Sequence, residues 1–209
     1  DSIASDIKNA KSNCHILSYI MLVDEAGYKI SDALIDATSR GVECRLLLDS
    51  MGSKAFLSSA LCKKIKDAGV HVVEALPANL LRAIFARVDL RNHRKIAVID
   101  NTIGYMGSNN IAEPSFAPKP KFAPWVDASV RLTGPIVREL QAIFIQDWFM
   151  DSDEDLSSLL KEPLEVDTSG FAAQLMATGP NSNNLALSQL LQTAFFSAKE
   201  ELVITTPYF

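Results

Sequence analysis

Long apolar runs are missing from this sequence, and several residue types are scarce. No stretch of 18 consecutive apolar residues occurs, so we expect no segment that spans a membrane. Gly and Pro number nine each, which excludes collagen-like and low-complexity chains. The N-terminus shows no signal-peptide pattern and both ends look cut, so we expect a fragment of a longer chain.

Cysteine is scarce as well. Cys14, Cys44 and Cys62 lie far apart in the chain and form no CxxC pair. An odd number of widely spaced cysteines favours reduced, buried thiols over a disulfide framework. We therefore expect a reducing compartment such as the cytosol.

An excess of positive charge is also missing. The chain has 20 basic and 25 acidic residues, for a formal net charge of −5. A protein that binds nucleic acid through a broad basic surface would show the opposite balance, so no nucleic-acid partner is expected. Any phosphate bound here must be held by a local cluster. The 48% hydrophobic and 22% charged residues are typical of a folded globular chain.

Helix-like and strand-like segments alternate through the first two-thirds of the chain. Helices are expected at 3–11, 28–40 and 53–68, and strands at 14–21, 42–48 and 70–74. Further strands are expected at 95–99, 103–106 and 126–132, and a helix from Gly134-Pro135 to about Met150. The strands around Asp100-Asn101-Thr102 predict a hairpin. The fold class is therefore α/β, a mixed β-sheet between helix layers.

The last third of the chain has weaker patterning. The acidic segment 151–170 is expected to be a solvated connector between a first domain, 1–150, and a final segment, 171–209. Strand candidates occur at 171–177 and 202–206, with a helix at 184–198 between them. A faint similarity between residues 7–20 and 195–208 suggests that a second copy of the domain begins near residue 184 and is cut off.

One motif carries most of the chemical information. His93, Lys95, Asp100, Gly107, Ser108 and Asn110 form the pattern H-x-K-x4-D-x6-G-S-x-N. By chance, a pattern of six specified residues at fixed offsets should occur in roughly a few of every million chains of this size. A lone His93 would more often be an ordinary polar residue, but the company of Lys95 and Asn110 favours a function.

The spacing suits a phosphate diester. On an extended segment, His93 and Lys95 point to the same side, and a hairpin at Asp100 brings Gly107 to Asn110 back beside them. His93 can attack phosphorus as a nucleophile, while Lys95 and Asn110 hold the non-bridging oxygens. Ser108 adds a hydroxyl, and Gly107 allows close backbone approach.

This motif resembles that of the phospholipase D superfamily. More narrowly, Asp89–Lys95 and Thr206–Phe209 resemble bacterial cardiolipin synthases. The resemblance implies a mixed sheet between helices, and two such domains that build one active site without metal or cofactor. It also implies that His93 forms a phosphohistidine while a second motif histidine acts as acid and base. The second motif is absent, because His15 and His71 lack the K-x4-D context.

Two carboxylates near the motif have expected supporting roles. Asp127, at the head of the strand 127–132, matches a family carboxylate that would bind the far ring nitrogen of His93. The alternative for Asp127 is an ordinary surface residue. Asp100 belongs to the motif, and we expect it to hold the motif in place rather than to transfer a proton.

Two segments beside the motif have open interpretations. Residues 80–88 form an amphipathic stretch flanked by Arg82, Arg87 and Arg91, which suits either an anionic lipid surface or an ordinary core-facing helix. Residues 114–125 carry four prolines and exclude regular structure. They are either a loop at the mouth of the site or an inert connector.

Three functions remain open. The first is half of a phosphatidyltransferase at the cytoplasmic face of a bacterial membrane, which condenses two phosphatidylglycerol molecules to cardiolipin and glycerol with a second motif domain in cis. The second is a phospholipase D-type hydrolase or nuclease. The third is a lipid-binding module without activity, since half of the catalytic set is missing. We expect the chain alone to be inactive or very weak.

Overall fold

A computed structural model describes residues 2–76, 91–116, 121, 123–163, 170–178 and 185–204. The chain divides into two compact units, Asp1–Leu175 and Met176–Phe209, which are described separately. The amphipathic stretch 80–88 and the segment Thr206–Phe209 lie outside the described residues. Among the helices that are described, none combines the length and the apolar character needed to cross a bilayer.

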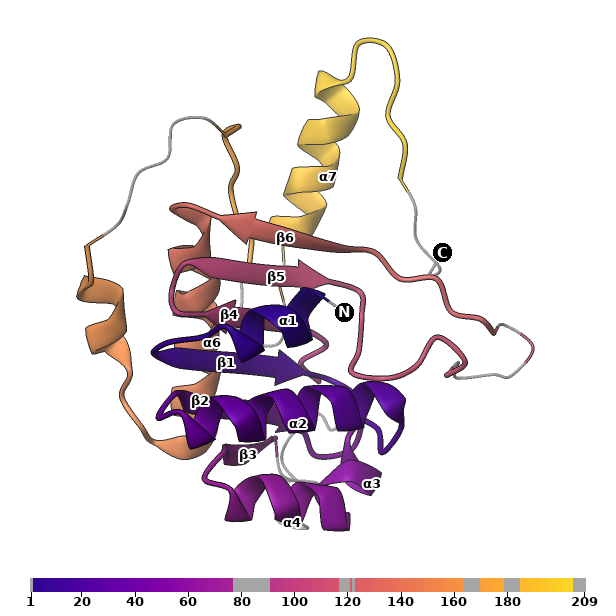
Figure 1. The fold of residues 1–209 in the computed structure, drawn as a ribbon. Coiled ribbons are helices and arrows are strands. Elements are labelled where there is room, and N and C mark those ends of the chain that lie inside the picture. The colour runs from indigo at the N-terminus through magenta and orange to yellow at the C-terminus, as the bar shows by residue number, and fades with distance from the viewer. Residues whose placement is uncertain are drawn as a thin grey trace, which may run out of the picture. The chain divides into compact units, whose positions relative to one another are not determined.

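The first unit is built on a six-stranded sheet in the order β3-β2-β1-β4-β5-β6 (Figure 1). The strands are β1 Asn13–Ser18, β2 Glu43–Asp49, β3 His71–Ala75, β4 Ile96–Ile99, β5 Ile103–Gly107 and β6 Ser129–Thr133. Strands β1, β2 and β3 are parallel, whereas the pairs β1–β4, β4–β5 and β5–β6 are antiparallel. The predicted α/β fold with a mixed sheet is confirmed, and so is the hairpin at Asp100.

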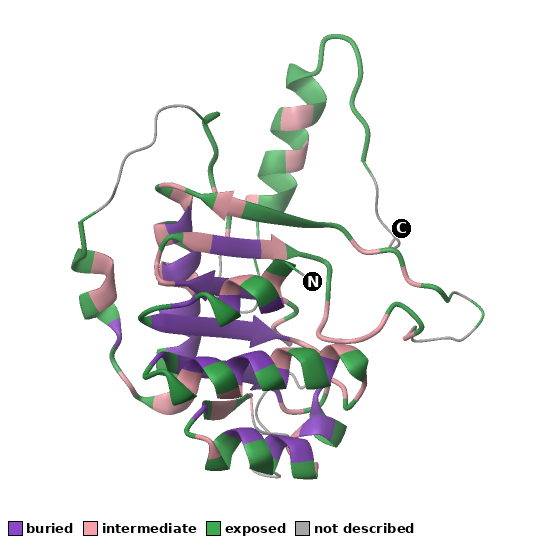
Figure 2. Ribbon diagram, in the orientation of Figure 1, coloured by how far each residue is buried: buried purple, intermediate pink, exposed green. Residues whose placement is uncertain are grey.

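Helices cover both faces of this sheet. They are α1 Ser2–Lys8, α2 Glu25–Ser39, α3 Lys54–Leu57, α4 Ala60–Asp67 and α6 Ile136–Ser152, followed by the 3-10 helix η2 Ser157–Lys161. Along β1, Cys14 and Ile16 face the core under α1 and α2, and Leu17 faces the core under α6. Buried residues therefore run through all of β1 (Figure 2) and through β2 after Glu43, as expected for strands covered on both sides. The three cysteines are free and buried, as predicted.

The helix ends follow from capping side chains. Asp24 accepts a hydrogen bond from the Gly27 backbone N–H, so α2 begins one turn earlier than the apolar spacing predicted. The expected helix at 53–68 is wrong as one element, because it is interrupted between α3 and α4. The hydroxyl of Ser58 hydrogen-bonds the Lys54 carbonyl, and Ser59 caps α4. Serine side chains that compete for backbone groups end a helix that apolar periodicity would continue.

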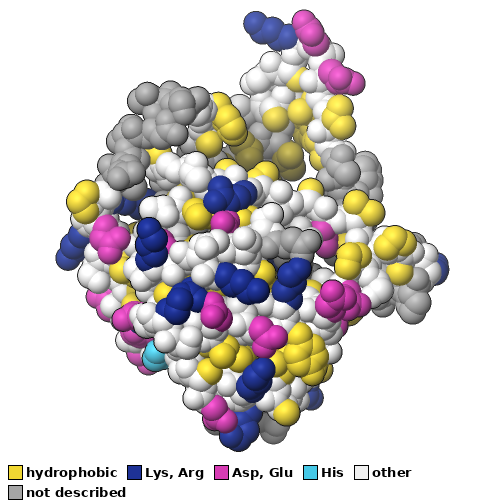
Figure 3. Space-filling model, viewed as in Figure 1, with side chains coloured by type: hydrophobic (Ala, Val, Ile, Leu, Met, Phe, Trp, Pro, Cys, Tyr) yellow, Lys and Arg dark blue, Asp and Glu magenta, His cyan; other side chains and the backbone are white. Residues whose placement is uncertain are grey.

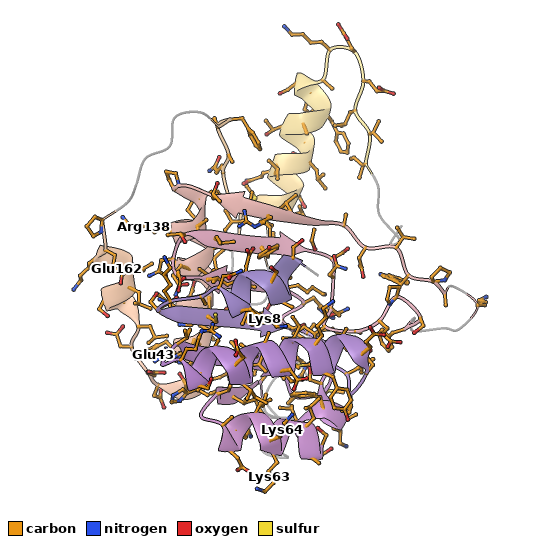
Figure 4. The ribbon with its side chains drawn as sticks, viewed as in Figure 1. Lys8, Glu43, Lys63, Lys64, Arg138 and Glu162 are labelled. Carbon is orange, nitrogen blue, oxygen red and sulfur yellow. The ribbon has the colours of Figure 1, made fainter. Side chains whose placement is uncertain are left out.

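Part of the segment 151–170, which was expected to be a solvated connector, packs against the rest of the first unit. Helix α6 continues through Ser152, and Glu154 then accepts a hydrogen bond from Trp148 Nε1 at 2.8 Å and pairs with Arg45 at 2.7 Å. Leu156 is buried in the core under α6. Figure 4 shows Arg138 beside Glu162, whose carbonyl accepts its hydrogen bond. The acidic composition therefore concealed packing contacts, and where the domains begin and end stays a prediction.

The strand expected at 171–177 is wrong, since these residues form neither helix nor strand and the Phe171 side chain is exposed. In the second unit, α7 Ala186–Ser197 confirms the predicted helix within two residues at its start. Residues 202–204 form no strand, and the remainder of that expected strand lies outside the described residues. The apolar side chains Phe195 and Phe196 of α7 are exposed.

Candidate active site

All motif residues except Asp100 lie where β1 ends and β4 begins. Strands β4 and β5 pair with Ile96 opposite Met106, so the residue before β4, Lys95, and the end of β5 at Gly107 lie side by side. Asp100 and Asn101 take positive φ angles of 52° and 54° to close the hairpin. Such left-handed angles are tolerated by Asp and Asn, which explains the turn chemistry read from the sequence.

Tyr19, directly after β1, contacts both His93 and Lys95. Its ring centroid lies 4.1 Å from that of His93, and Lys95 Nζ lies 5.6 Å from the Tyr19 ring centroid. Lys95 Nζ also donates a hydrogen bond of 2.7 Å to the His93 carbonyl. Our sequence interpretation placed Tyr19 in a buried strand and missed this role. Its position at the carboxyl end of a strand was the signal that could have revealed it.

Asn110 is anchored next to Tyr19. Its Oδ1 accepts a hydrogen bond of 3.2 Å from the Ile20 backbone N–H. No residue in the described part of the chain accepts a hydrogen bond from the Asn110 amide NH2 group, which leaves two donors for an anion. The predicted group of His93, Lys95 and Asn110 therefore assembles around residues 19 and 20, the two that follow β1.

Burial and charge set the protonation of the two motif residues. Burial, and secondarily the Lys95 ammonium, lowers the pKa of His93, so its imidazole is neutral at pH 7. Burial also lowers the pKa of Lys95, while the charge of Asp127 acts in the opposite direction. A neutral imidazole beside an ammonium is the state that a nucleophilic histidine requires.

The tautomer of His93 follows from its hydrogen bond. His93 Nδ1 lies 3.2 Å from the backbone carbonyl of Arg91. A carbonyl can only accept, so this contact places the proton on Nδ1 and leaves the lone pair on Nε2. Nε2 is therefore the atom able to attack phosphorus.

Asp127 and Ser108 bind each other, contrary to both expectations. Ser108 Oγ donates to Asp127 Oδ1 at 2.7 Å and accepts from the Ala128 N–H at 3.0 Å. Within the described ranges Asp127 makes no hydrogen bond to His93, and it precedes β6 by two residues rather than opening the strand. The Ser108 hydroxyl thus joins β5 to β6 and is not left to bind phosphate.

Gly107 serves the same junction. A Cβ at this position would lie 2.3 Å from the Ala128 carbonyl oxygen. The close backbone approach that the sequence predicted is real, but the neighbour is the chain entering β6. Gly107 therefore lets two strands meet beside the site.

Asp100 ties the far end of β4 to the start of β1. Its carboxylate accepts backbone N–H groups from Lys11 at 2.9 Å, Ser12 at 2.7 Å and Asn13 at 3.1 Å. His93 precedes β4 and Asp100 follows it, so the two lie at opposite ends of that strand. This placement suits the structural role predicted for Asp100.

A buried ion pair holds the segment before β4 from one side. Arg91 Nε lies 2.7 Å from Asp49 Oδ2 at the end of β2, and Arg91 Nη2 donates to Ser50 Oγ at 2.8 Å. The two paired side chains are 8% and 1% exposed. Arg91 is one of the arginines that flank the amphipathic stretch 80–88, and its paired, buried guanidinium is not available to an anionic lipid surface.

A second carboxylate holds the same segment from α6. Asp147 accepts hydrogen bonds from Arg94 Nη1 at 2.8 and 2.5 Å, and from Asn92 Nδ2 at 2.7 Å. The Arg94 backbone N–H in turn donates to Asn92 Oδ1 at 3.0 Å. His93 is therefore flanked by residues that Asp49 and Asp147 hold in place, and neither carboxylate was identified from the sequence.

The other two described histidines lie elsewhere. His15 is fully buried, hydrogen-bonded to Gln141 at 2.7 Å and stacked on Phe144 at 4.7 Å, as predicted for a packed residue. Burial lowers the pKa of His15 to about 4. His71 is exposed at the amino end of β3, whereas Tyr19 follows the carboxyl end of the parallel strand β1. The two residues therefore lie at opposite ends of the parallel strands.

Comparison with known families assigns the chain to a family. A family model described as "Cardiolipin synthase, PLD-like domain" matches residues 3–148. The chain belongs to the phospholipase D-like family. The matched range includes every strand of the sheet and all six motif residues.

Curated relatives of this phospholipase D-like chain carry the name cardiolipin synthase A. The protein from Pectobacterium carotovorum is 39% identical over 215 residues, which is 100% of this chain and 44% of the relative. That from Wigglesworthia glossinidia brevipalpis is 37% identical over 212 residues, 99% of this chain and 43% of the relative. The chain thus spans less than half the length of these relatives.

A solved structure supports the fold. The phospholipase D family member Nuc from Salmonella typhimurium matches with a TM-score of 0.52 and 18% identity, covering 74% of this chain and 89% of Nuc. At this identity the match shows that the two chains share the phospholipase D-like architecture.

Proposed function

We propose that this chain supplies the nucleophilic half of a cardiolipin synthase, which transfers a phosphatidyl group from one phosphatidylglycerol to another and releases glycerol. The observation that carries the proposal is the neutral His93 beside Lys95 and the free amide donors of Asn110. Relatives named cardiolipin synthase A support the choice of reaction.

The chemistry follows from the atoms that face the site. His93 Nε2 attacks the phosphorus of phosphatidylglycerol, forming a P–N bond as the P–O bond to the headgroup glycerol breaks. Lys95 Nζ and the Asn110 NH2 group bind the non-bridging oxygens as their charge redistributes. The hydroxyl of a second phosphatidylglycerol then attacks the phosphohistidine, which restores His93 and yields cardiolipin.

Each of these steps needs a proton donor or acceptor on the other side of the phosphate. His15 is buried and His71 lies at the opposite end of the parallel strands, so neither is suited to the task. We assign this role to a second domain of the same longer chain, an assignment supported by the length of the relatives. Because the proposed substrate is a membrane lipid, we place the reaction at the surface of a bacterial membrane, on the cytoplasmic side.

The test uses phosphatidylglycerol labelled in its phosphate. The labelled lipid is supplied to this chain and to a longer protein that contains this chain and matches its relatives in length. We expect cardiolipin and glycerol from the longer protein, and a labelled phosphohistidine that His93→Ala abolishes and His71→Gln retains. Phosphatidic acid as the sole product would instead assign a hydrolase, DNA cleavage alone a nuclease, and lipid binding without any product a binding module.

A further inference from the structure

A pocket of about 380 Å³ opens beside the phosphate-binding residues Lys95 and Asn110. It lies between helices α1 and α2 and the strands β1, β4, β5 and β6 of the first unit. This volume falls within the range of about 300–1,000 Å³ that small-molecule sites occupy. The pocket is thus large enough to take part of a substrate whose phosphate is bound at its rim.

The interior of the pocket is apolar. Its lining includes Ile3 of α1, Ile30 of α2 and Ile111, all of which are only half-buried and pack against the core under α1 and α2. Half-buried aliphatic side chains that converge on one cavity gain free energy when an apolar group displaces water from it. A polar glycerol headgroup would gain little from such walls.

Charged groups lie at the rim of this pocket rather than in its interior. Lys29 and Arg131 line it and are exposed, and Arg131 Nε is paired with Asp6 at 2.8 Å. On the face covered by α1 and α2, basic and acidic side chains are interspersed (Figure 3). An apolar cavity with a polar rim and a phosphate site at one end matches an amphiphile, not a fully polar ligand.

We propose that this pocket receives one acyl chain of the phospholipid whose phosphate binds at Lys95 and Asn110. The inference rests on the proposed function and adds a subsite to it. Lys95 and Asn110 line both the phosphate site and the pocket, so a chain tethered to the bound phosphate enters the cavity without leaving the protein surface. The occupant is the first part of the chain, nearest the glycerol backbone.

The test variant fills the pocket from α2. Ala26 lies in the first turn of that helix, is half-buried and lines the pocket, so Ala26→Phe places a ring in the cavity. The matched control is Ala60→Phe, at the exposed first residue of α4 and outside the pocket. Both changes add the same apolar side chain near a helix start, so they differ mainly in location.

The measurement is calorimetric titration of this chain with water-soluble ligands below their micelle concentrations. These are glycerophosphoglycerol, which has no acyl chain, and dibutyryl- and dihexanoyl-phosphatidylglycerol. Each methylene that enters the pocket tightens Kd by up to about fourfold. We expect dihexanoyl-phosphatidylglycerol to bind the wild type and Ala60→Phe at least about tenfold more tightly than glycerophosphoglycerol. In Ala26→Phe this gain disappears while glycerophosphoglycerol binds as before.

The outcomes separate the inference from the proposed function. Suppose that glycerophosphoglycerol binds and that Lys95→Ala weakens this binding. If affinity then does not depend on acyl-chain length, or if both Phe variants lose the same affinity, the acyl pocket is overturned and the proposed function stands. Failure of glycerophosphoglycerol to bind, or equal binding by wild type and Lys95→Ala, contradicts the proposed function and the inference with it. The unchanged headgroup affinity also reports that Ala26→Phe is folded.

Discussion

Asp147 of α6 accepts three hydrogen bonds from the segment that carries His93, and Asp147→Asn is a sharp perturbation of that segment. The carboxylate is 6% exposed, and the Arg94 side chain that it pairs with is 14% exposed. The amide that replaces it has nearly the same shape but no charge. Any loss of stability therefore reports the lost charge and the lost hydrogen-bond acceptor rather than a cavity.

The expected magnitude follows from burial. Removing one partner of a buried ion pair leaves the other charge uncompensated and costs about 3–5 kcal/mol. Arg94 is partly exposed, so we expect the lower end, about 3 kcal/mol. The Lys63–Asp67 pair of α4 supplies the matched control, since its side chains are 76% and 62% exposed. For Asp67→Asn we expect at most about 0.5 kcal/mol.

The assay is urea unfolding at pH 7, with the free energy of unfolding compared at unchanged slope. Asp147→Asn should lower the unfolding midpoint clearly, and Asp67→Asn should leave it close to the wild type. If the two variants lose the same free energy, the Asp147 charge does not hold the segment before β4, and the argument for how His93 is positioned fails.

Three further predictions concern other contacts. The unfolded chain binds a proton at His15 near pH 6.5, whereas the folded chain binds it only near pH 4. The free energy of unfolding should therefore fall by about 3 kcal/mol as the pH drops through this window. Urea titrations at several pH values measure this change, and the same pH dependence should remain in His71→Gln. Gly104→Ala would place a Cβ 2.6 Å from Leu140 Cδ1, and a fall in stability of about 1–3 kcal/mol should appear as a lower melting temperature. Asp100→Ala removes the acceptor for three backbone N–H groups, so hydrogen exchange at Lys11 to Asn13 should accelerate at least tenfold, and unchanged exchange rates would contradict the structural role.

The sheet was predictable because its signals are local. Apolar runs mark β1 and β2, and Asp100-Asn101 marks the hairpin that brings Lys95 beside Gly107. The interruption between α3 and α4 was missed because apolar spacing does not record that serine hydroxyls compete for backbone groups. Similarly, acidic composition hid the buried contacts of Glu154.

Within the site, spacing placed His93, Lys95 and Asn110 together, since a hairpin fixes which residues lie side by side. Spacing could not reveal which groups are already bound. Ser108 bonds across 19 residues to Asp127, and Arg91 pairs across 42 residues with Asp49. Such partners depend on how distant elements pack, and a single sequence does not encode them in any local pattern.

Strand β6 forms one edge of the sheet, and this position affects how the chain behaves in solution. Four of its five residues are exposed, Val130 among them, and no described strand pairs with its outer side (Figure 2). An unpaired edge offers a row of N–H and C=O groups to any other extended segment, including one from another molecule. Concentrated samples of the chain will therefore tend to self-associate through β6 unless a further element covers it.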